Sequence, residues 1–346
     1  MKGGGARSGI ERRMSRCSGW QWSGALAAAA RLGAFAMLSC LPVASTFAQA
    51  LPDPIRVIVP VMAGSSIDAR ARVVADALGK RLQLRVLVEN RPGAGGVVGT
   101  LSVARSKPDG SILLFTNNAH VIGAHVHRDP GFDPVRDFAP ITSVYESGMV
   151  LVAHPDLRVA SVKDLVALGR SQGASLNYAS SGTGSLPHLG MEVFKRAAGL
   201  AFAHVPYKGD GQALTDVLPG RVPLMVGGYP ASMPAIQAGT LRALAVTSLS
   251  RASVLPDVPT MAEAGYPDAT LNVWTGFFAP ARTPTAVIDR LNRAIAEAVA
   301  TPAVKDNLAA TGAKAWTTSP ASFAAFIAQE NARYEKLVTE LGLKQQ

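Results

Sequence analysis

Residues 55–90 read IRVIVPVMAGSSIDARARVVADALGKRLQLRVLVEN, and this stretch predicts a strand–helix–strand unit. Its two ends, 55–60 and 84–90, are short runs rich in Val and Ile, as expected of buried strands. Between them, residues 68–82 carry apolar side chains at helical spacing. The same alternation continues along most of the chain. It predicts an α/β fold of doubly wound sheets with helices on both faces.

Two long apolar strand regions, near 144–154 and 273–280, interrupt the alternation. They separate two blocks of strand–helix units, so we expect two lobes joined by two crossover strands. Lobe 1 would comprise residues 51–150 and 279–346, and lobe 2 would comprise residues 151–278. A cleft would then lie between the lobes, and the crossovers would act as its hinges.

The first 50 residues have the order of an export signal. Basic residues come first, followed by the apolar run LGAFAMLSCLPVAS (32–45) and then by AQA, which ends at Ala50. The run is shorter than the roughly 20 apolar residues that span a bilayer. We therefore predict cleavage near Ala50 and a location in the periplasm. Lipid attachment at Cys40 is an alternative, and either Met1 or Met14 is the start.

The charge balance argues against a nucleic-acid partner. The whole chain has 34 Lys and Arg residues against 24 Asp and Glu. Without the leader's six basic residues and one acidic residue, 28 face 23, which is a net charge of +5. No dense basic stripe with interleaved aromatic residues is present. Both cysteines, Cys17 and Cys40, lie in the leader, so the mature chain has no disulfide and no Cys-based metal site.

The segment NYASSGTGSLPHLG (177–190) contains a polar loop between a strand-like and a helix-like run. Its Ser, Thr and Gly residues could hold an anion on backbone N–H groups, or they could present a catalytic serine. A nucleophile elbow would read G-x-S-x-G, and none occurs. His188 is only three residues from Ser185, which is too local for the usual remote base. An anion cradle is therefore favoured, and an exported hydrolase that uses Ser185 is the alternative.

Other motifs give little support for a cofactor. The turn ENRPGAGGVVGT (89–100) has Val98 where a dinucleotide fingerprint needs its last glycine, and there is no P-loop. On an extended segment, His125 and His127 would place their rings on one side and could contribute to a zinc site. Exposed loop histidines are the simpler interpretation. We expect no cofactor and no metal.

An ordered set of motifs resembles one family. The motifs are GSSIDARARVVADAL (64–78), ENRPGAGG (89–96), DPVRDFAPIT (133–142), NYASSGTGSLPHL (177–189), VPYKGDGQALTDVLPG (205–220) and LPDVPTMAEAGYP (255–267). The sequence resembles the substrate-binding receptors of tripartite tricarboxylate transporters, the Bug or TctC-like family. Such an ordered set is far more specific than any single glycine pattern.

The resemblance implies a two-lobed periplasmic-binding-protein (Venus-flytrap) architecture without enzymatic activity. Such a receptor closes around a small carboxylate ligand, which is held by backbone N–H groups and hydroxyls from both lobes. It is a monomer that serves membrane transporter subunits; a ligand sensor without transport is an alternative. The positions implied to bind the ligand are Gly64, Ser65, Ser66, Asp68, Asn117, His120, Ser181, Gly182, Thr183, Gly184, Ser185, His188, Tyr207 and Gly227.

The resemblance also gives these positions roles. Residues 64–68 would form the anion seat of lobe 1, and residues 181–185 would form the cradle of lobe 2. Asn117 and His120 would line the cleft. His188 would support the cradle from the first turn of the following helix.

Two positions depart from the family's pattern, and two carry more specific expectations. VMAGSS at 61–66 replaces an aromatic residue, prolines and glycines, and adds two hydroxyls. At Gly227 the family often has an acid that could meet a ligand amine, so its absence counts against amino-acid ligands. Tyr207 would lie near the far wall of the cleft. Asp68 would order its own loop, because a bare carboxylate would repel a carboxylate ligand. The identity of the ligand stays open.

Overall fold

The computed structural model describes residues 50–344. The predicted basic region, the apolar run, the start at Met14 and the lipid site at Cys40 all fall outside these residues. Within residues 50–344, no helix has both the length and the apolar character that crossing a membrane requires.

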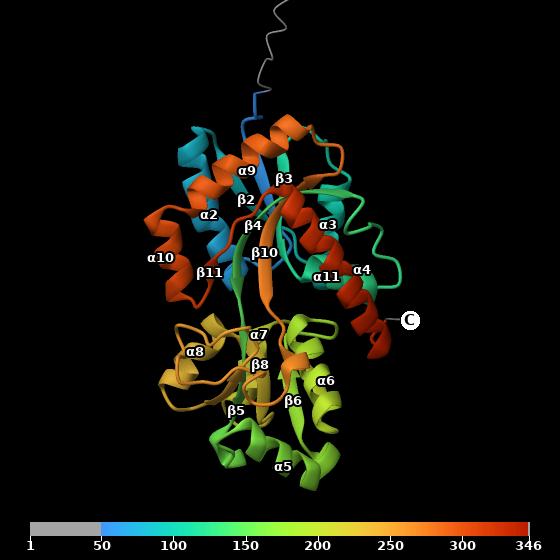
Figure 1. Ribbon diagram of the computed structural model, residues 1–346, viewed down its shortest axis with the longest axis vertical. Coiled ribbons are helices and arrows are strands. Elements are labelled where there is room, and N and C mark those ends of the chain that lie inside the picture. The colour runs from blue at the N-terminus through green and yellow to red at the C-terminus, as the bar shows by residue number, and fades with distance from the viewer. Residues whose placement is uncertain (1–49, 345–346) are drawn as a thin grey trace, which may run out of the picture. The chain divides into compact units, whose positions relative to one another are not determined.

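A six-stranded sheet forms the centre of the first lobe (Figure 1). Its strand order is β11-β4-β10-β3-β1-β2. The strands are β1 (Ile55–Val59), β2 (Val86–Asn90), β3 (Ile112–Asn117), β4 (Phe138–Ser147), β10 (Val273–Pro280) and β11 (Lys314–Ala315). The helices of this lobe are α2 (Ser66–Leu82), α3 (Val97–Ala104), α4 (Ala119–Val126), α9 (Thr285–Val299), α10 (Pro302–Ala310) and α11 (Pro320–Glu340).

A five-stranded sheet of order β7-β6-β8-β5-β9 forms the centre of the second lobe. Its strands are β5 (Met149–Ala153), β6 (Asn177–Ser180), β7 (Ala203–Pro206), β8 (Leu224–Gly228) and β9 (Arg242–Val246). Its helices are α5 (Val162–Gln172), α6 (Leu186–Ala198), α7 (Asp210–Val217) and α8 (Tyr229–Gln237). Four short 3-10 turns complete the described chain: η2 (Ala94–Gly96), η3 (Pro155–Leu157), η4 (Gly173–Ser175) and η5 (Pro267–Ala269). The predicted two-lobed α/β fold is confirmed.

Both faces of the first sheet are buried, which explains the continuous apolar runs in its strands. Successive side chains of a strand point to opposite faces. Val57 and Val59 accordingly pack in one cluster with residues of α2, α9 and α10. Ile58 packs in another cluster with residues of α3, α4 and α11.

The carboxyl ends of the parallel strands in both sheets face the crossing between the sheets. In the first sheet, Asn117 at the end of β3 pairs with Thr275 near the start of β10. In the second sheet, Gly228 at the end of β8 pairs with Met149, the first residue of β5. β1 and β2 run parallel to β3, and β6 and β7 run parallel to β8. The loops and helix N-termini that follow these strands therefore meet between the sheets, where open α/β sheets bind ligands.

The first crossing is a single residue long. Ser147 ends β4 in the first sheet and Met149 begins β5 in the second, so only Gly148 lies between them. The strand region predicted near 144–154 is thus two strands in two sheets.

The second crossing lies before β10, which corrects the predicted lobe boundary. The boundary between residues 278 and 279 falls inside β10, yet all of β10 from Val273 to Pro280 pairs in the first sheet. The apolar run of β10 is buried between β3 and β4, so it continues that sheet up to the crossing. The sheets therefore divide the chain near Asn272.

A buried asparagine fixes the path of this second crossing. Asn118 is fully buried, and its Oδ1 accepts a hydrogen bond from the Trp274 N–H at 3.1 Å. Its Nδ2 donates to the Asn272 carbonyl at 3.1 Å and to the Tyr334 hydroxyl at 3.0 Å. Leaving one of these buried partners unsatisfied would cost about 1–3 kcal/mol. The side chain therefore ties the crossing to the start of α4 and to α11.

We expect Gly148→Ala to destabilise the protein by about 1–3 kcal/mol, the usual cost of overpacking. A Cβ at this position would lie 2.3 Å from the Tyr229 hydroxyl oxygen and 2.8 Å from Ser248 Cβ. Urea unfolding measures the effect. Gly211→Ala is the matched control, because a Cβ there meets no atom within 4 Å. Equal stability of the two variants would contradict the close packing at the crossing.

Candidate functional site

The lobe 1 loop leads from β1 into α2. Ser65 caps the helix, because its Oγ accepts a hydrogen bond from the Asp68 N–H at 3.3 Å. The Gly64 N–H donates to Asp68 Oδ2 at 2.8 Å, and Gly64 has a φ of +81°, which glycine adopts readily. In the described chain, the Ser66 and Ile67 N–H groups have no protein acceptor. These two groups at a helix N-terminus are donors available to an anion.

Asp68 orders this loop, as the sequence predicted. The side chain is 3% exposed. Besides Gly64, it accepts hydrogen bonds from Asn90 Nδ2 at 2.9 Å and from Arg72 Nε at 3.2 Å. Burial by itself raises the pKa of Asp68, but these hydrogen bonds outweigh burial and hold the pKa below its ordinary value. The carboxylate is ionised, and its ion pair with Arg72 at 3.0 Å offsets its charge.

The cradle loop, residues 181–185, leads from β6 into α6. Gly182 and Gly184 have φ values of +132° and +74°, which turn the backbone sharply. Between residues 50 and 344, no acceptor binds the N–H groups of Ser181 and Thr183. The loop thus offers free donors beside the N-terminus of α6.

Two stacked histidines support the cradle loop. His188 Nδ1 accepts the Gly184 N–H at 3.0 Å. Its ring stacks on His204 with centroids 3.9 Å apart. His204 Nε2 lies 2.7 Å from Ser180 Oγ, which in turn accepts the Gly182 N–H at 3.2 Å. The Gly184 N–H is therefore bound directly by His188. The Gly182 N–H is bound by Ser180, which His204 contacts in turn.

The histidine pair is neutral at neutral pH. Burial lowers the pKa of His188. Burial, with a further contribution from neighbouring His188, lowers the pKa of His204 to about 4. A neutral His188 leaves its Nδ1 lone pair available to the Gly184 N–H. Ser180 and His204 were not predicted as site residues; the parallel pairing of β6 with β7 brings their strands together.

His120 does not line the cleft, contrary to the prediction. Its side chain is 1% exposed and packs against the rings of Phe132, Phe138 and Phe278. Its Nε2 lies 2.8 Å from the Pro134 carbonyl. Burial lowers the pKa of His120 to about 4. The first turn of α4 directs this ring into the core between helix and sheet.

Three other positions predicted to bind the ligand are Asn117, Tyr207 and Gly227. Asn117 ends β3 at the crossing edge, but its Oδ1 accepts the Ala119 N–H at 3.0 Å. The Tyr207 hydroxyl donates to Asp216 Oδ2 at 2.8 Å near the far end of α7, so it is turned away from the cradle loop. Gly227 lies buried in β8.

Ser185 has the geometry of a helix cap. Its Oγ accepts the His188 N–H at 3.4 Å, and its N–H donates to the Gly182 carbonyl at 3.1 Å. The His188 ring is bound to Gly184 instead, so it does not activate the Ser185 hydroxyl.

The expected extended His125-x-His127 segment is wrong, because α4 extends through Val126. His125 Nε2 lies 2.8 Å from Asn331 Oδ1 in α11. In the part of the chain that the structure describes, no group of three or more His, Cys, Asp or Glu residues could hold a metal ion.

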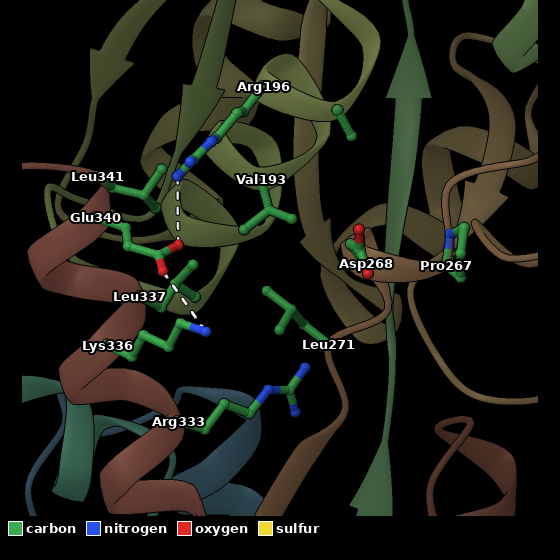
Figure 2. Close-up of a pocket in the computed structure, with 11 residues that line it drawn as sticks. Val193, Arg196, Pro267, Asp268, Leu271, Arg333, Lys336, Leu337, Glu340 and Leu341 are labelled. Atoms are coloured by element: carbon green, nitrogen blue, oxygen red, sulfur yellow. Dashed lines mark hydrogen bonds and ion pairs between the residues drawn. The ribbon is translucent and has the colours of Figure 1, made fainter.

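The two lobes are in contact at the cradle loop and along α11. A Cβ added at Gly184 would lie 2.7 Å from Val126 Cγ1 at the end of α4. Arg196 of α6 pairs with Glu340 of α11 at 3.3 Å. Figure 2 shows this pair beside a pocket of about 710 Å³ between α6, η5 and α11. No residue of the cradle loop lines this pocket, so we place the candidate site at the loops and not there.

The two sheets, their facing loops and the free N–H groups define a two-lobed solute-binding protein. The chain belongs to the family described as tripartite tricarboxylate transporter family receptor, whose model matches residues 70–343. This is a family of binding receptors rather than enzymes.

Known relatives cover most of the chain. Protein BugT of Bordetella pertussis is 38% identical over 293 residues, which are 84% of this chain and 90% of BugT. The structure "R. palustris Rpa4515 with adipate" is 33% identical with a TM-score of 0.77, over 83% of this chain and 97% of that one. MatC from Rhodopseudomonas palustris with bound malate is 29% identical with a TM-score of 0.74, over 82% and 98% of the two chains.

Asp68→Asn should lower the free energy of unfolding by about 1.5–3 kcal/mol at pH 7, as expected when a buried charged hydrogen-bond acceptor is lost. The folded-state pKa of Asp68 is below its unfolded value, so its contribution is present above about pH 4 and disappears as pH falls through the folded pKa. Urea unfolding at pH 7 and pH 3 measures this difference. Asp76→Asn, at an exposed position of the same helix, is the control. If wild type and Asp68→Asn differed in unfolding free energy by the same amount at pH 3 as at pH 7, the ionised Asp68 carboxylate would not be what stabilises the loop.

Gly184→Ala should weaken ligand binding by tenfold or more. The new Cβ would meet Val126 across the interlobe contact and would strain a residue with positive φ. Gly199→Ala at the other end of α6 is the matched control: its φ is +67°, and its Cβ would meet nothing within 4 Å. Calorimetry on both variants separates contact between lobes from backbone strain. Equal affinities would show that this contact does not matter for the bound state.

Proposed function

We propose that this protein is a periplasmic receptor that captures a small organic carboxylate between its lobes for a tripartite tricarboxylate-type transporter. The observation that carries the proposal is the pair of facing loops with free N–H groups. Ser66 and Ile67 supply donors from lobe 1, and Ser181 and Thr183 supply donors from lobe 2. Both loops are held in shape by buried partners, so little order has to be created on binding.

The strength of such a site is adequate for a receptor. Hydrogen bonds to a charged group contribute about 1.5–3 kcal/mol each. Three or four of them in a closed cleft would support micromolar binding, which corresponds to about −8 kcal/mol. Family membership and the carboxylates in the adipate and malate structures of relatives support a carboxylate as ligand.

A binding role without catalysis fits the chemistry of the loops. The Ser185 hydroxyl is engaged in capping α6, and the nearest imidazole is bound to a backbone N–H. The competing function, an exported hydrolase, requires turnover of an ester or amide that Ser185→Ala abolishes. Membrane transporter subunits as partners, a monomeric state and cleavage of the leader near Ala50 complete the proposal.

The test begins with protein unfolded and refolded to remove any bound ligand. A thermal-shift panel of mono-, di- and tricarboxylates, including adipate and malate, should give at least one stabilising acid. A ligand at 100 times its dissociation constant adds about 2.7 kcal/mol of stability. Small-angle scattering should then show a smaller radius with that acid bound. No stabilisation by any acid would contradict the proposed function.

Thr183→Ala and Ser66→Ala should each weaken binding of that acid by about 1–3 kcal/mol. Neither hydroxyl has a hydrogen-bond partner in the described chain, so the melting temperature should stay unchanged. Ser171→Ala in α5 is the control, because its hydroxyl only donates to the Leu168 carbonyl. Calorimetric titration of the three variants decides the point. Normal affinity in both loop variants would mean that these two hydroxyls do not contact the acid.

A further inference from the structure

Asp210 carries a buried carboxylate oxygen without a protein partner. The residue opens α7, and its Oδ2 accepts the Gly228 N–H at 2.9 Å. Its Oδ1 is buried and receives no hydrogen bond from any residue between 50 and 344. Burial raises the pKa of Asp210, and only the Gly228 N–H opposes that rise. No Lys, Arg or His side chain of the described residues pairs with Asp210, so a ligand cation beside Oδ1 would oppose that rise and favour the ionised form.

The Asp210 carboxylate lies at the same sheet edge as the cradle loop. β6 leads into the cradle loop, and its parallel neighbour β8 ends at Gly228, which holds Asp210. Neighbouring strands are about 4.8 Å apart. The segment that leads into α7 also passes the cradle loop, because the Tyr207 N–H donates to the Ser180 carbonyl at 3.0 Å. The Tyr207 carbonyl oxygen is also close to the cradle loop, because a Cβ added at Gly182 would lie 3.3 Å from it.

The Asp210 carboxylate, which accepts hydrogen bonds and donates none when it is ionised, thus lies next to the free N–H donors of the cradle loop. The N–H groups of Ser181 and Thr183 attract an anion, whereas an ionised Asp210 repels one. A plain carboxylate ligand would satisfy the cradle loop but would offer no hydrogen-bond donor to the Asp210 Oδ1. A ligand with a carboxylate and an ammonium group on neighbouring atoms satisfies both, because the ammonium is a donor with three N–H groups.

Building on the proposed function, we infer that this receptor selects carboxylates that also carry an ammonium group, with the carboxylate on the cradle loop and the ammonium on Asp210. Asp210 is thus a specificity-determining residue of the site. From the sequence alone, the absence of an acid at Gly227 counts against such ligands. In the structure the acid comes from α7 instead: Asp210 binds Gly228, the residue that follows Gly227.

The experiment compares acids that differ only in the amino group. Ligand-free wild type is titrated with L-glutamate against glutarate, L-aspartate against succinate, and L-leucine against 4-methylpentanoate. We expect the amino member of the best-binding pair to bind at least tenfold more tightly. Asp210→Asn should reduce that ratio at least tenfold while leaving the affinity for the plain acid equal or higher. Asp257→Asn, at an exposed position of the same lobe, should change neither.

A second measurement does not depend on the variant's folding. The N-acetyl derivative of the best-binding amino acid has no charge on nitrogen, so it should bind wild type at least tenfold more weakly than the parent. Binding of plain acids without preference for their amino partners would overturn the role of Asp210 and leave the receptor function intact. The same holds if only acids without an amino group bind. Failure of every acid, including the wider carboxylate panel, would overturn the proposed function itself.

Discussion

The structure depends on the pairing of β10 with β4 and β3, because these strands carry the chain to and from the second lobe. β10 is antiparallel to both neighbours and is buried along nearly its whole length. Its start is fixed by Asn118, and β4 passes to β5 through Gly148 alone. The carboxyl ends of the parallel strands in both sheets are thereby directed at the same crossing. The two loops could not face one another without this constraint.

The loops themselves are stiffened by local polar contacts instead of by ligand. Asp68 gathers Gly64, Asn90 and Arg72 around one carboxylate in lobe 1. In lobe 2, neutral His188 and His204 hold the backbone of the cradle loop through Gly184 and, by way of Ser180, through Gly182. A site prepared in this way spends less of its interaction energy on ordering itself when the ligand arrives.

The fold class could be predicted because the patterns that indicate its strands and helices lie within short stretches of the sequence. Alternating strand and helix patterns predicted the α/β class, and the two long apolar strand regions predicted two lobes. The lobe boundary was misplaced because β10 and β5 are apolar in the same way, although they belong to different sheets. Only pairing partners, which periodicity does not reveal, distinguish them.

The candidate site was predictable only in part. Asp68 and His188 lie four residues from their partners Gly64 and Gly184, so their supporting roles could be inferred from sequence spacing. Ser65 and Ser185 were predicted to bind the ligand, whereas the structure shows their hydroxyls capping α2 and α6. His120 was misjudged because the direction of a side chain depends on packing against distant residues. Asp210 and His204 were missed for the same reason, since their partners Gly228 and Ser180 are 18 and 24 residues away.

The central claim is that both lobes donate backbone N–H groups to one carboxylate. Amide resonances of the isotopically labelled, ligand-free protein test this most directly, titrated with the acid that binds most tightly. Hydrogen bonding to an anion moves an amide proton downfield, so the protons of Ile67 in lobe 1 and Thr183 in lobe 2 should both move downfield with the same affinity. Movement in one lobe only, or in neither, would contradict the account.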